Sequence, residues 1–431
     1  MRHLLCGAVT ALALPVLAGA AYAQGCSPAP VGQREYDQTL PLTLERAVAR
    51  AGHAAPEILI AALEARAASA DADQAGRWLN PAISVDTENF AGTGGLEGFD
   101  AYETTLALEQ TFRLGGKRRL SERAARAEAA LASAECNVQR LEAQRLAGEL
   151  FLDLQAAIEM ADVADASASL AEEFANVVER RVEAGAAAPP ELLRAKAEAA
   201  SLQAAADAAR GNVEAAAISL ASIWGSPDVD YVLPRPENFD VATDSTGSDG
   251  VRVTHPRLQA AQASADARAA ATDRARAGAW PDVTVSAGVR RFEDTGDSAF
   301  LAGISLPLPV FDRNQDATRA ARFRTEGAEL NARAVEARLR AEQASLAAQV
   351  RAAKSRLQRL EGEALPLAEG AYASAAEGYR VGKFDLTATL DARRSLIETR
   401  AAVIEARLAL QTQTLRLRAL IGAAPFEGEI Q

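Results

Sequence analysis

The sequence predicts a mainly α-helical chain with a smaller β part, built as an internal duplication. Two observations lead to this fold class. Residues that break helices recur at matching places about 200 positions apart, and each copy holds two short runs of alternating polarity between long alanine-rich runs. The recurring pairs are Pro56 and Pro256, Pro81 and Pro281, each 200 apart, and Gly185 and Gly382, Gly225 and Gly422, each 197 apart.

The composition favours long helices over compact domains. Aromatic residues make up only 5% of the chain, and alanine dominates together with Glu, Arg, Leu and Gln. This mixture is typical of long helices and coiled coils. The formal net charge is −12 and no stripe of basic residues stands out, which argues against binding to nucleic-acid phosphates. We therefore expect no nucleic-acid partner.

The N-terminus is typical of an export signal. Residues 1–23 form a signal peptide, with an apolar run that ends in the small-residue motif Ala21-Tyr22-Ala23. Two alternatives stay open, an uncleaved membrane anchor and lipid attachment at Cys26. An extended segment is expected at 24–43. After cleavage only Cys26 and Cys136 remain, which predicts no disulfide framework.

The first repeat is expected at 44–225. Its elements are a helix from Leu44 to Trp78 interrupted at Gly52 and Pro56, a strand at 81–90, a second strand from Tyr102, a proline-free helix from Lys117 to Glu183, and a helix from Pro189 to Trp224. In the first strand, Ile83 and Val85 alternate with Ser84 and Asp86. At 1.5 Å per residue, the proline-free helix would be roughly 100 Å long.

The second repeat is expected at 253–422, after a linker at 226–252 and before a tail at 423–431. Its elements are a helix from Pro256 to Ala279, strands at 281–292 and 299–308, a long helix from Asn314 to Tyr379, and a last helix that ends at Leu420. Pro366 lies inside the long helix. Because proline has no N–H to donate, it predicts a kink or a local break there.

The four alternating runs predict an oligomer. Runs of about ten residues with period two are what the strands of transmembrane barrels require. Four strands cannot close a barrel, whereas three chains would supply 12 strands, a number that outer-membrane barrels allow. The predicted fold is therefore a trimeric 12-stranded transmembrane β-barrel, four strands per chain, continued by long helical rods. A structural coiled coil without a pore is the alternative, but it has no need for these strands.

Three strings carry a family resemblance: LEQTFRLGGKRR at 108–119, LPLPVFDRNQ at 306–315 and YRVGKFDLTATLDARRSL at 379–396. In this order, over residues 44–422, the chain resembles the TolC-like outer-membrane efflux proteins. The FDRNQ form resembles the branch that serves heavy-metal efflux of the cobalt-zinc-cadmium type. The resemblance implies a homotrimer, with its barrel in the outer-membrane lipid of a Gram-negative bacterium and its α-helical tunnel in the periplasm.

The resemblance also implies partners and a function. The partners are a periplasmic adaptor (membrane fusion) protein and a proton-driven inner-membrane pump of the resistance-nodulation-division type. The function is that of a passive outer-membrane channel in a tripartite efflux system, with heavy-metal cations as the expected cargo. Export of organic compounds or of proteins through the same type of channel stays open. No catalytic constellation stands out, so we expect no enzymatic activity and no cofactor.

Asp391 is the first candidate for selectivity at the tunnel entrance. The family's tip hairpin often carries two aspartates three positions apart. Asp391 matches the second of them, and Ala388 departs from the first. Three copies of Asp391 would form a negative ring that attracts cations. The alternative is a solvated carboxylate near the start of a helix.

Asp385 and Arg194 are the other candidates at the entrance. We expect Asp385 to cap the helix that begins at Leu386, with a pore-lining role as the alternative. Arg194 holds, in the first copy, the place that Asp391 holds in the second. It is interpreted as an unrelated surface residue, and an Arg–Asp latch between neighbouring hairpins is the alternative.

Gly185 and Gly382 are expected at the two turns of the tip, because glycine adopts positive φ without strain. The resemblance makes these turns the place where the adaptor docks. The neighbours that match docking positions are Glu183 and Ala186 in the first copy, and Val381 and Lys383 in the second.

Metal binding by the chain itself is not predicted. His53 and His255 stand at nearly duplicated positions and are interpreted as helix-start residues, and Cys136 stands alone in a helix. No cluster of Cys, His and Asp has the spacing of metal ligands.

Overall fold

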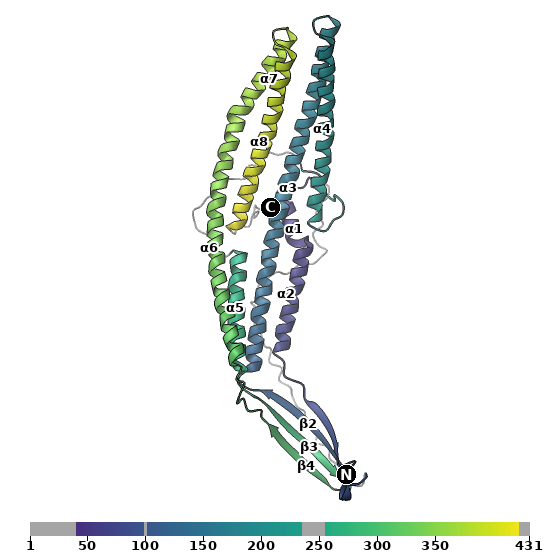
Figure 1. Ribbon diagram of the computed structural model, residues 1–431, viewed down its shortest axis with the longest axis vertical. Helices are drawn as coiled ribbons and strands as arrows, with labels where there is room; N and C mark the ends of the chain where they lie inside the picture. The colour runs from purple at the N-terminus through teal and green to yellow at the C-terminus, as the bar shows by residue number, and fades with distance from the viewer. Residues whose placement is uncertain (1–39, 99–100, 235–254, 422–431) are drawn as a thin grey trace, which may run out of the picture.

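The computed structural model describes residues 40–98, 101–234 and 255–421. In this part of the chain, long helices form an elongated rod at one end and four strands form a sheet at the other (Figure 1). Two helical hairpins end side by side at the tip opposite the sheet. None of the described helices contains an apolar stretch long enough to cross a membrane. The predicted signal peptide, Cys26 and the tail lie outside the described residues, as does most of the linker.

The elements follow the predicted duplicated order. The first copy contains α1 (Leu44–Ala54), α2 (Pro56–Ala75), β1 (Ala82–Glu88), the short 3₁₀ helix η1 (Gly94–Leu96), β2 (Glu103–Arg113), α3 (Lys117–Glu183) and α4 (Pro189–Ser222). The second contains α5 (Pro256–Ala277), β3 (Asp282–Phe292), β4 (Ser298–Ser305), α6 (Gln315–Arg359), the π-helical segment η2 (Leu360–Ala364), α7 (Leu365–Arg380) and α8 (Leu386–Leu420). The 67-residue α3 has the predicted bounds.

Two expectations about element ends are wrong. His255 is the N-cap of α5, as interpreted, but His53 lies in the last turn of α1. The chain breaks at Ala55, because a residue before proline is pushed to extended backbone and Pro56 then opens α2. Strand β4 ends at Ser305 rather than 308, because Pro307 cannot donate a ladder hydrogen bond.

Pro366 produces the predicted local break in the second long helix. The five residues before α7 form the π segment η2, in which the N–H of Leu365 donates to the carbonyl of Leu360. A π segment holds one residue more per turn than the surrounding α-helix. The chain thus accommodates Pro366 without ending the rod, and α6 and α7 continue in the same direction (Figure 1).

The sheet joins the two copies. Its strand order is β1-β2-β3-β4 with antiparallel neighbours throughout. The central pair, β2 with β3, runs in register from Glu103 opposite Phe292 to Arg113 opposite Asp282. At the helix end of this pair, Lys117 Nζ lies 2.7 Å from Asp282 Oδ1. The first copy therefore leaves the sheet for α3 at the level where the second copy enters the sheet from α5.

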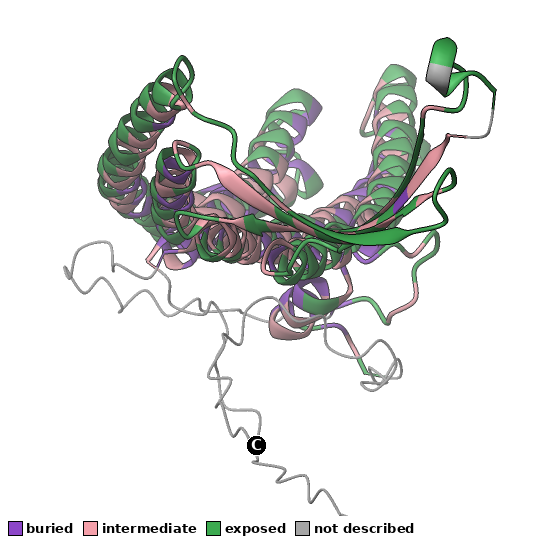
Figure 2. Ribbon diagram, turned by 90° about the horizontal axis from the view of Figure 1, so that it is seen from below, coloured by how far each residue is buried: buried purple, intermediate pink, exposed green. Residues whose placement is uncertain are grey.

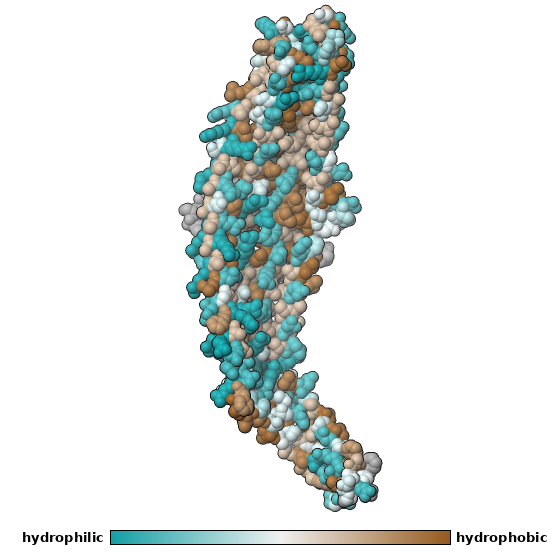
Figure 3. Space-filling view, viewed as in Figure 1, coloured by the Kyte–Doolittle hydropathy of each residue, from teal (hydrophilic) through white to brown (hydrophobic). Residues whose placement is uncertain are grey.

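The register gives the sheet one apolar and one polar face. Val85, Leu106, Val289 and Phe300 lie opposite one another across the four strands and share a face. Most large apolar side chains of this face are exposed in the single chain: Ile83, Val85, Leu106, Leu108, Phe112, Val285, Val289, Phe300 and Ile304. Figure 3 shows hydrophobic surface around the junction of sheet and rods. This face needs an apolar neighbour.

The rods pack around α3, which contacts α1, α2, α4, α5 and α8. Seen from below, buried residues lie where helices face one another, and the sheet is mostly half-buried or exposed (Figure 2). The largest core cluster joins α1, α3, α4 and α8 halfway along the molecule, with Leu152, Leu154 and Leu220 at its centre. The small side chain of Gly148 lets Leu415 of α8 approach α3 closely.

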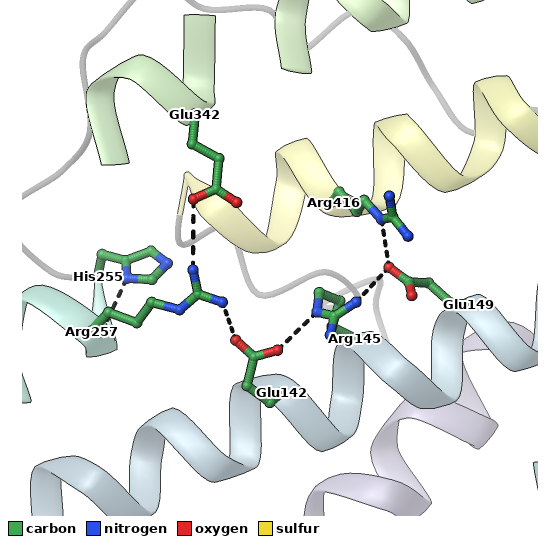
Figure 4. A network of polar contacts seen from close by, with 7 residues as sticks. All are labelled: Glu142, Arg145, Glu149, His255, Arg257, Glu342 and Arg416. Carbon is green, nitrogen blue, oxygen red and sulfur yellow. Dashed lines mark hydrogen bonds and ion pairs between the residues drawn. The ribbon is translucent and has the colours of Figure 1, made fainter. Parts of the chain in front are cut away.

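A row of alternating charges, which we call the waist network, links four helices at the same height (Figure 4). Its members are Glu342 of α6, Arg257 of α5, Glu142, Arg145 and Glu149 of α3, and Arg416 of α8. Glu149 Oε1 accepts from Arg145 at 2.6 Å and from Arg416 at 2.7 Å. Because each internal member has two partners, fewer side-chain rotamers need to be fixed for each contact than in isolated pairs.

Contacts in and beside the waist network shift the pKa values of its titratable groups. Burial alone would raise the pKa of Glu142 and Glu149, but hydrogen bonds from their arginine partners hold both pKa values below the usual value. His255 is 2% exposed, and its Nδ1 accepts from the backbone N–H of Arg257 at 3.1 Å. Burial, and then the charge of Arg257, lowers the pKa of His255, whereas Glu142 opposes the shift. The folded chain therefore favours neutral His255.

This predicts an acid-sensitive waist. A folded-state pKa below that of the unfolded chain stabilises the fold above the unfolded value, and this contribution is lost as the pH falls. For His255 the loss begins near pH 6.5, its ordinary pKa. We expect His255→Asn, which replaces the accepting Nδ1 by an amide oxygen that can also cap the helix, to flatten the dependence of Tm on pH between 7.5 and 5.5. Thermal unfolding followed by circular dichroism measures it. His53→Asn is the control, because His53 is an exposed residue in the last turn of α1, and it should keep the wild-type slope.

Candidate functional site: the tips of the two helical hairpins

Each hairpin turns at a glycine with positive φ, as predicted. The φ angle is +71° at Gly185 and +78° at Gly382. At the first turn the N–H of Ala186 donates to the carbonyl of Arg181 at 2.7 Å, and at the second the N–H of Lys383 donates to Gly378 at 2.7 Å. These are the long bonds of Schellman motifs. Any other residue at either glycine would strain the turn.

The residues predicted for docking surround these turns. All six are exposed: Glu183, Gly185, Ala186, Val381, Gly382 and Lys383. Phe384, which the sequence analysis did not single out, lies beside them with 52% of its surface exposed. Its ring fills the space that a Cβ on Gly378 would need, 2.2 Å from that position. The second turn therefore presents a fixed aromatic ring to solvent.

Arg181 connects the two hairpins at their tips. It lies in the last turn of α3, and its Nη1 donates to the carbonyl of Tyr379 on α7. Its Nη2 donates to the carbonyl of Ala186 at 3.1 Å, and its Cζ lies 4.7 Å from the centre of the Tyr379 ring. One guanidinium thus supports its own turn and holds the neighbouring hairpin.

Tyr379 makes the return contact. Its hydroxyl donates to Glu191 Oε2 of α4 at 3.0 Å, and its ring lies 5.2 Å from that of Phe174 on α3. Burial raises the pKa of Tyr379 to about 12, with Glu191 adding to the shift and Arg181 opposing it. The phenol is therefore protonated at neutral pH and remains a donor. The other oxygen of Glu191 accepts from the backbone N–H of Ala188 at 3.3 Å, at the start of α4.

Arg393 forms a buried link below the turns. It lies on α8 with a side chain only 2% exposed, and its Nη2 lies 3.3 Å from Glu198 Oε1 on α4. Its Cζ lies 5.9 Å from the Phe174 ring. Its Nε has no hydrogen-bond partner among the described residues. Removing Glu198 would leave a buried charge without its nearest counter-charge, which is costly.

The candidate entrance residues lie near these links. Asp391 is exposed on α8. Asp385 is the N-cap of α8, as expected, and its Oδ1 accepts from the N–H of Ala388 at 2.8 Å. Arg194 donates from Nη1 to Thr387 Oγ1 at 3.2 Å, so it does bridge the hairpins. Among the described residues of this one chain its partner is Thr387, and no pair with Asp391 forms.

Four contact residues of the tip were not predicted from the sequence: Arg181, Glu191, Tyr379 and Arg393. Their partners lie far away along the chain, and Glu191 and Tyr379 are 188 positions apart. Local spacing therefore gives no signal for the pairing. The capping position of Glu191, three residues after Ala188, was visible, but it predicts only a helix start.

Cys136 contradicts the expectation that the chain has no disulfide framework. It is fully buried against α2, with Sγ 3.9 Å from the Ile58 carbonyl oxygen, and it is disulfide-bonded. Distance along the sequence does not limit a disulfide, since only the separation in space does. The other two cysteines of the chain lie outside the described residues. In the part that the structure describes, no three His, Cys, Asp or Glu side chains are arranged to hold a metal ion.

Known proteins are similar to this chain in sequence. Residues 48–226 and 249–423 match the family of outer membrane efflux proteins. The chain is 28% identical over 400 residues to the cobalt-zinc-cadmium resistance protein CzcC of Cupriavidus metallidurans, covering 91% of this chain and 93% of that protein. It is 30% identical over 303 residues to the nickel-cobalt-cadmium resistance protein NccC of Alcaligenes xylosoxydans xylosoxydans, covering 69% and 68%.

A solved structure has the same fold. The outer membrane protein VceC of Vibrio cholerae superposes with a TM-score of 0.75 at 23% sequence identity, covering 88% of this chain and 96% of that one. The fold class predicted from the sequence, mainly helical with a barrel part, is confirmed.

The hydroxyl of Tyr379 is testable by itself. Tyr379→Phe keeps the ring and removes the donor to Glu191, and a hydrogen bond to a charged group is worth about 1.5–3 kcal/mol. We expect amide exchange at both turns to become about tenfold faster or more. Exchange measured by mass spectrometry reports this. Tyr372→Phe is the matched control, because Tyr372 lies on the same helix and its hydroxyl has no partner among the described residues. Equal protection in both variants would contradict the link.

Proposed function

The chain belongs to the outer membrane efflux protein family, and from this premise we propose that its channel conducts heavy-metal cations. It is a channel component of the Gram-negative outer membrane, with a large periplasmic part and no enzymatic role. It works as a trimer together with an adaptor and an inner-membrane pump in a tripartite efflux system. The nature of the cargo is the open question.

One observation carries the proposed cargo. The similarity to a protein of cobalt, zinc and cadmium resistance extends over 91% of the chain, so it includes the tip as well as the sheet. Exposed Asp391 supports the same cargo, because three carboxylates around an entrance concentrate cations and repel anions. Ala388 leaves the entrance with one such residue per chain at this place.

The sheet supports closure by three chains. Strands β1 and β4 are its two edges, and each leaves a row of backbone groups that another strand can pair with. Three copies would pair these edges in turn and close a 12-stranded barrel, with the apolar face against lipid. A purely structural coiled coil has no use for an exposed apolar sheet.

The tip supports docking of the adaptor. The exposed residues around Gly185 and Gly382 form two fixed turns at the end farthest from the sheet. In a chain whose sheet lies in the outer membrane, this end points into the periplasm. We place the adaptor there, and beyond it a proton-driven pump of the resistance-nodulation-division type.

The proposed cargo can be tested by deleting the gene for this chain in the bacterium that carries it. We expect tolerance to Co²⁺, Zn²⁺ or Cd²⁺ to fall, and to return when the chain is supplied again, because the pump then regains its exit. Growth in graded metal concentrations measures this. Tolerance to organic compounds such as detergents and dyes should stay unchanged. Loss of tolerance to organic compounds alone would contradict the metal cargo.

Asp391 at the entrance is tested by ion selectivity. Asp391→Asn should lower the ratio of cation to anion permeability by at least about twofold, because each of the three lost unit charges, acting over about 8 Å in water, contributes slightly less than RT. Reversal potentials of the purified trimer in planar bilayers give this ratio. Asp385→Asn is the comparison, since asparagine caps a helix as well as aspartate does. If only Asp385→Asn changes the ratio, then Asp385 is the pore-lining residue.

A further inference from the structure

Charged side chains gather on the polar face of the sheet, at the end far from the helices. The register places Asp86, Glu88 and Glu103 on the face opposite the exposed apolar side chains. Arg290 of β3 lies on this polar face, opposite Thr105. Three carboxylates and one guanidinium therefore share a short stretch of the sheet, distant from Asp391 at the other end of the molecule (Figure 1).

Arg290 binds across three strands. Its Nη2 lies 2.9 Å from Glu88 Oε2 of β1, and its Nη1 donates to Glu103 Oε2 of β2 at 2.8 Å. Its Nε donates to Thr105 Oγ1 at 2.9 Å. Asn89 holds the second oxygen of Glu103 at 3.2 Å. The guanidinium is thus fixed in place, and so are the two carboxylates that it partly neutralises.

The two faces of the sheet are in different environments in a membrane barrel. Phe300 and Ile304 are 92% and 78% exposed on the apolar face, and in an outer-membrane protein such side chains face lipid. The polar face then lines the lumen. The pair of Arg113 and Asp282 is the end of the β2–β3 ladder nearest the helices. Arg290 lies eight residues beyond Asp282 on β3. Its level is the outer mouth of the channel.

We propose that Arg290 determines the ion selectivity of the outer mouth, by neutralising part of the negative charge that Asp86, Glu88 and Glu103 place in the lumen. The inference rests on the proposed function, because it assigns the polar face to the lumen of a cation channel. With Arg290 present, each chain contributes two net negative charges at this level. A cation that passes Asp391 at the entrance meets this second negative region at the exit. The arginine keeps the attraction weak enough for release.

The test compares two neighbouring arginines. Arg290→Gln removes the lumenal cation from each of the three chains and should raise the ratio of cation to anion permeability by at least about twofold, because unit charges about 8 Å apart in water interact by slightly less than RT. Arg291→Gln is the matched control. Arg291 follows directly in β3 but lies on the opposite face, where it pairs with Glu293 at 3.2 Å. It should leave the ratio unchanged. Reversal potentials of the trimer in planar bilayers measure both.

A change of opposite sign gives an independent measurement. Glu103→Gln should lower the permeability ratio, and both effects should shrink in 1 M salt, where charges are screened within about 3 Å. If Arg290→Gln does not form trimers with heat-modifiable migration, Glu103→Gln and Arg290→Lys carry the test, and the lysine variant should keep the wild-type ratio. Equal ratios in Arg290→Gln and Arg291→Gln, or an unchanged ratio in Glu103→Gln, overturn the inference. Metal tolerance that is intact in these variants would leave the proposed function standing.

Discussion

The hydrogen-bonded ladder between β2 and β3 is the constraint on which the other features depend. It is the join between the two copies within the sheet, and eleven residue pairs fix its register. A slip of one residue would turn every side chain of one copy to the other face. Because the register holds, the helices of both copies meet the sheet at one level, and both hairpins end side by side at the tip (Figure 1). The contacts of Arg181 and Tyr379 can form only if the two rods, each roughly 100 Å long, start from matched positions.

Polar contacts are distributed unequally along the rods. At the waist, six charged side chains on four helices form a continuous row beside a large apolar cluster. At the tip, the two hairpins are joined by the contacts of Arg181, Tyr379, Arg194 and Arg393, around a smaller cluster. Few buried contacts mean a low local free energy of opening. The middle of the molecule therefore has more buried contacts than the tip, and we expect the contacts at the tip to open at a lower free energy.

Local signals made much of the fold predictable. The absence of proline predicted α3, and glycine predicted both turns. The alternation of polar and apolar residues predicted the strands and their faces. Each of these signals depends on residues a few positions apart. The tip contacts and the waist network were not predictable, because Glu191 and Tyr379, or Glu142 and Arg257, meet only after the rods have packed. The same reason explains the disulfide of Cys136. His53 was misplaced because its near-duplicate position relative to His255 suggested a helix start, whereas the helix that begins at Leu44 continues through His53.

The π segment η2 has a consequence for how the second copy can vary. One additional residue in a helix advances all later side chains by about 100° around its axis. The face that α7 turns toward its neighbours is therefore out of phase with the face of α6. Substitutions in α6 that keep its length do not change the angular position of the residues at the tip. Loss of the additional residue of η2, in contrast, would rotate Tyr379 away from Glu191. The first copy, with its unbroken α3, has no such phase step, and this difference makes the two hairpins unequal partners around the channel axis.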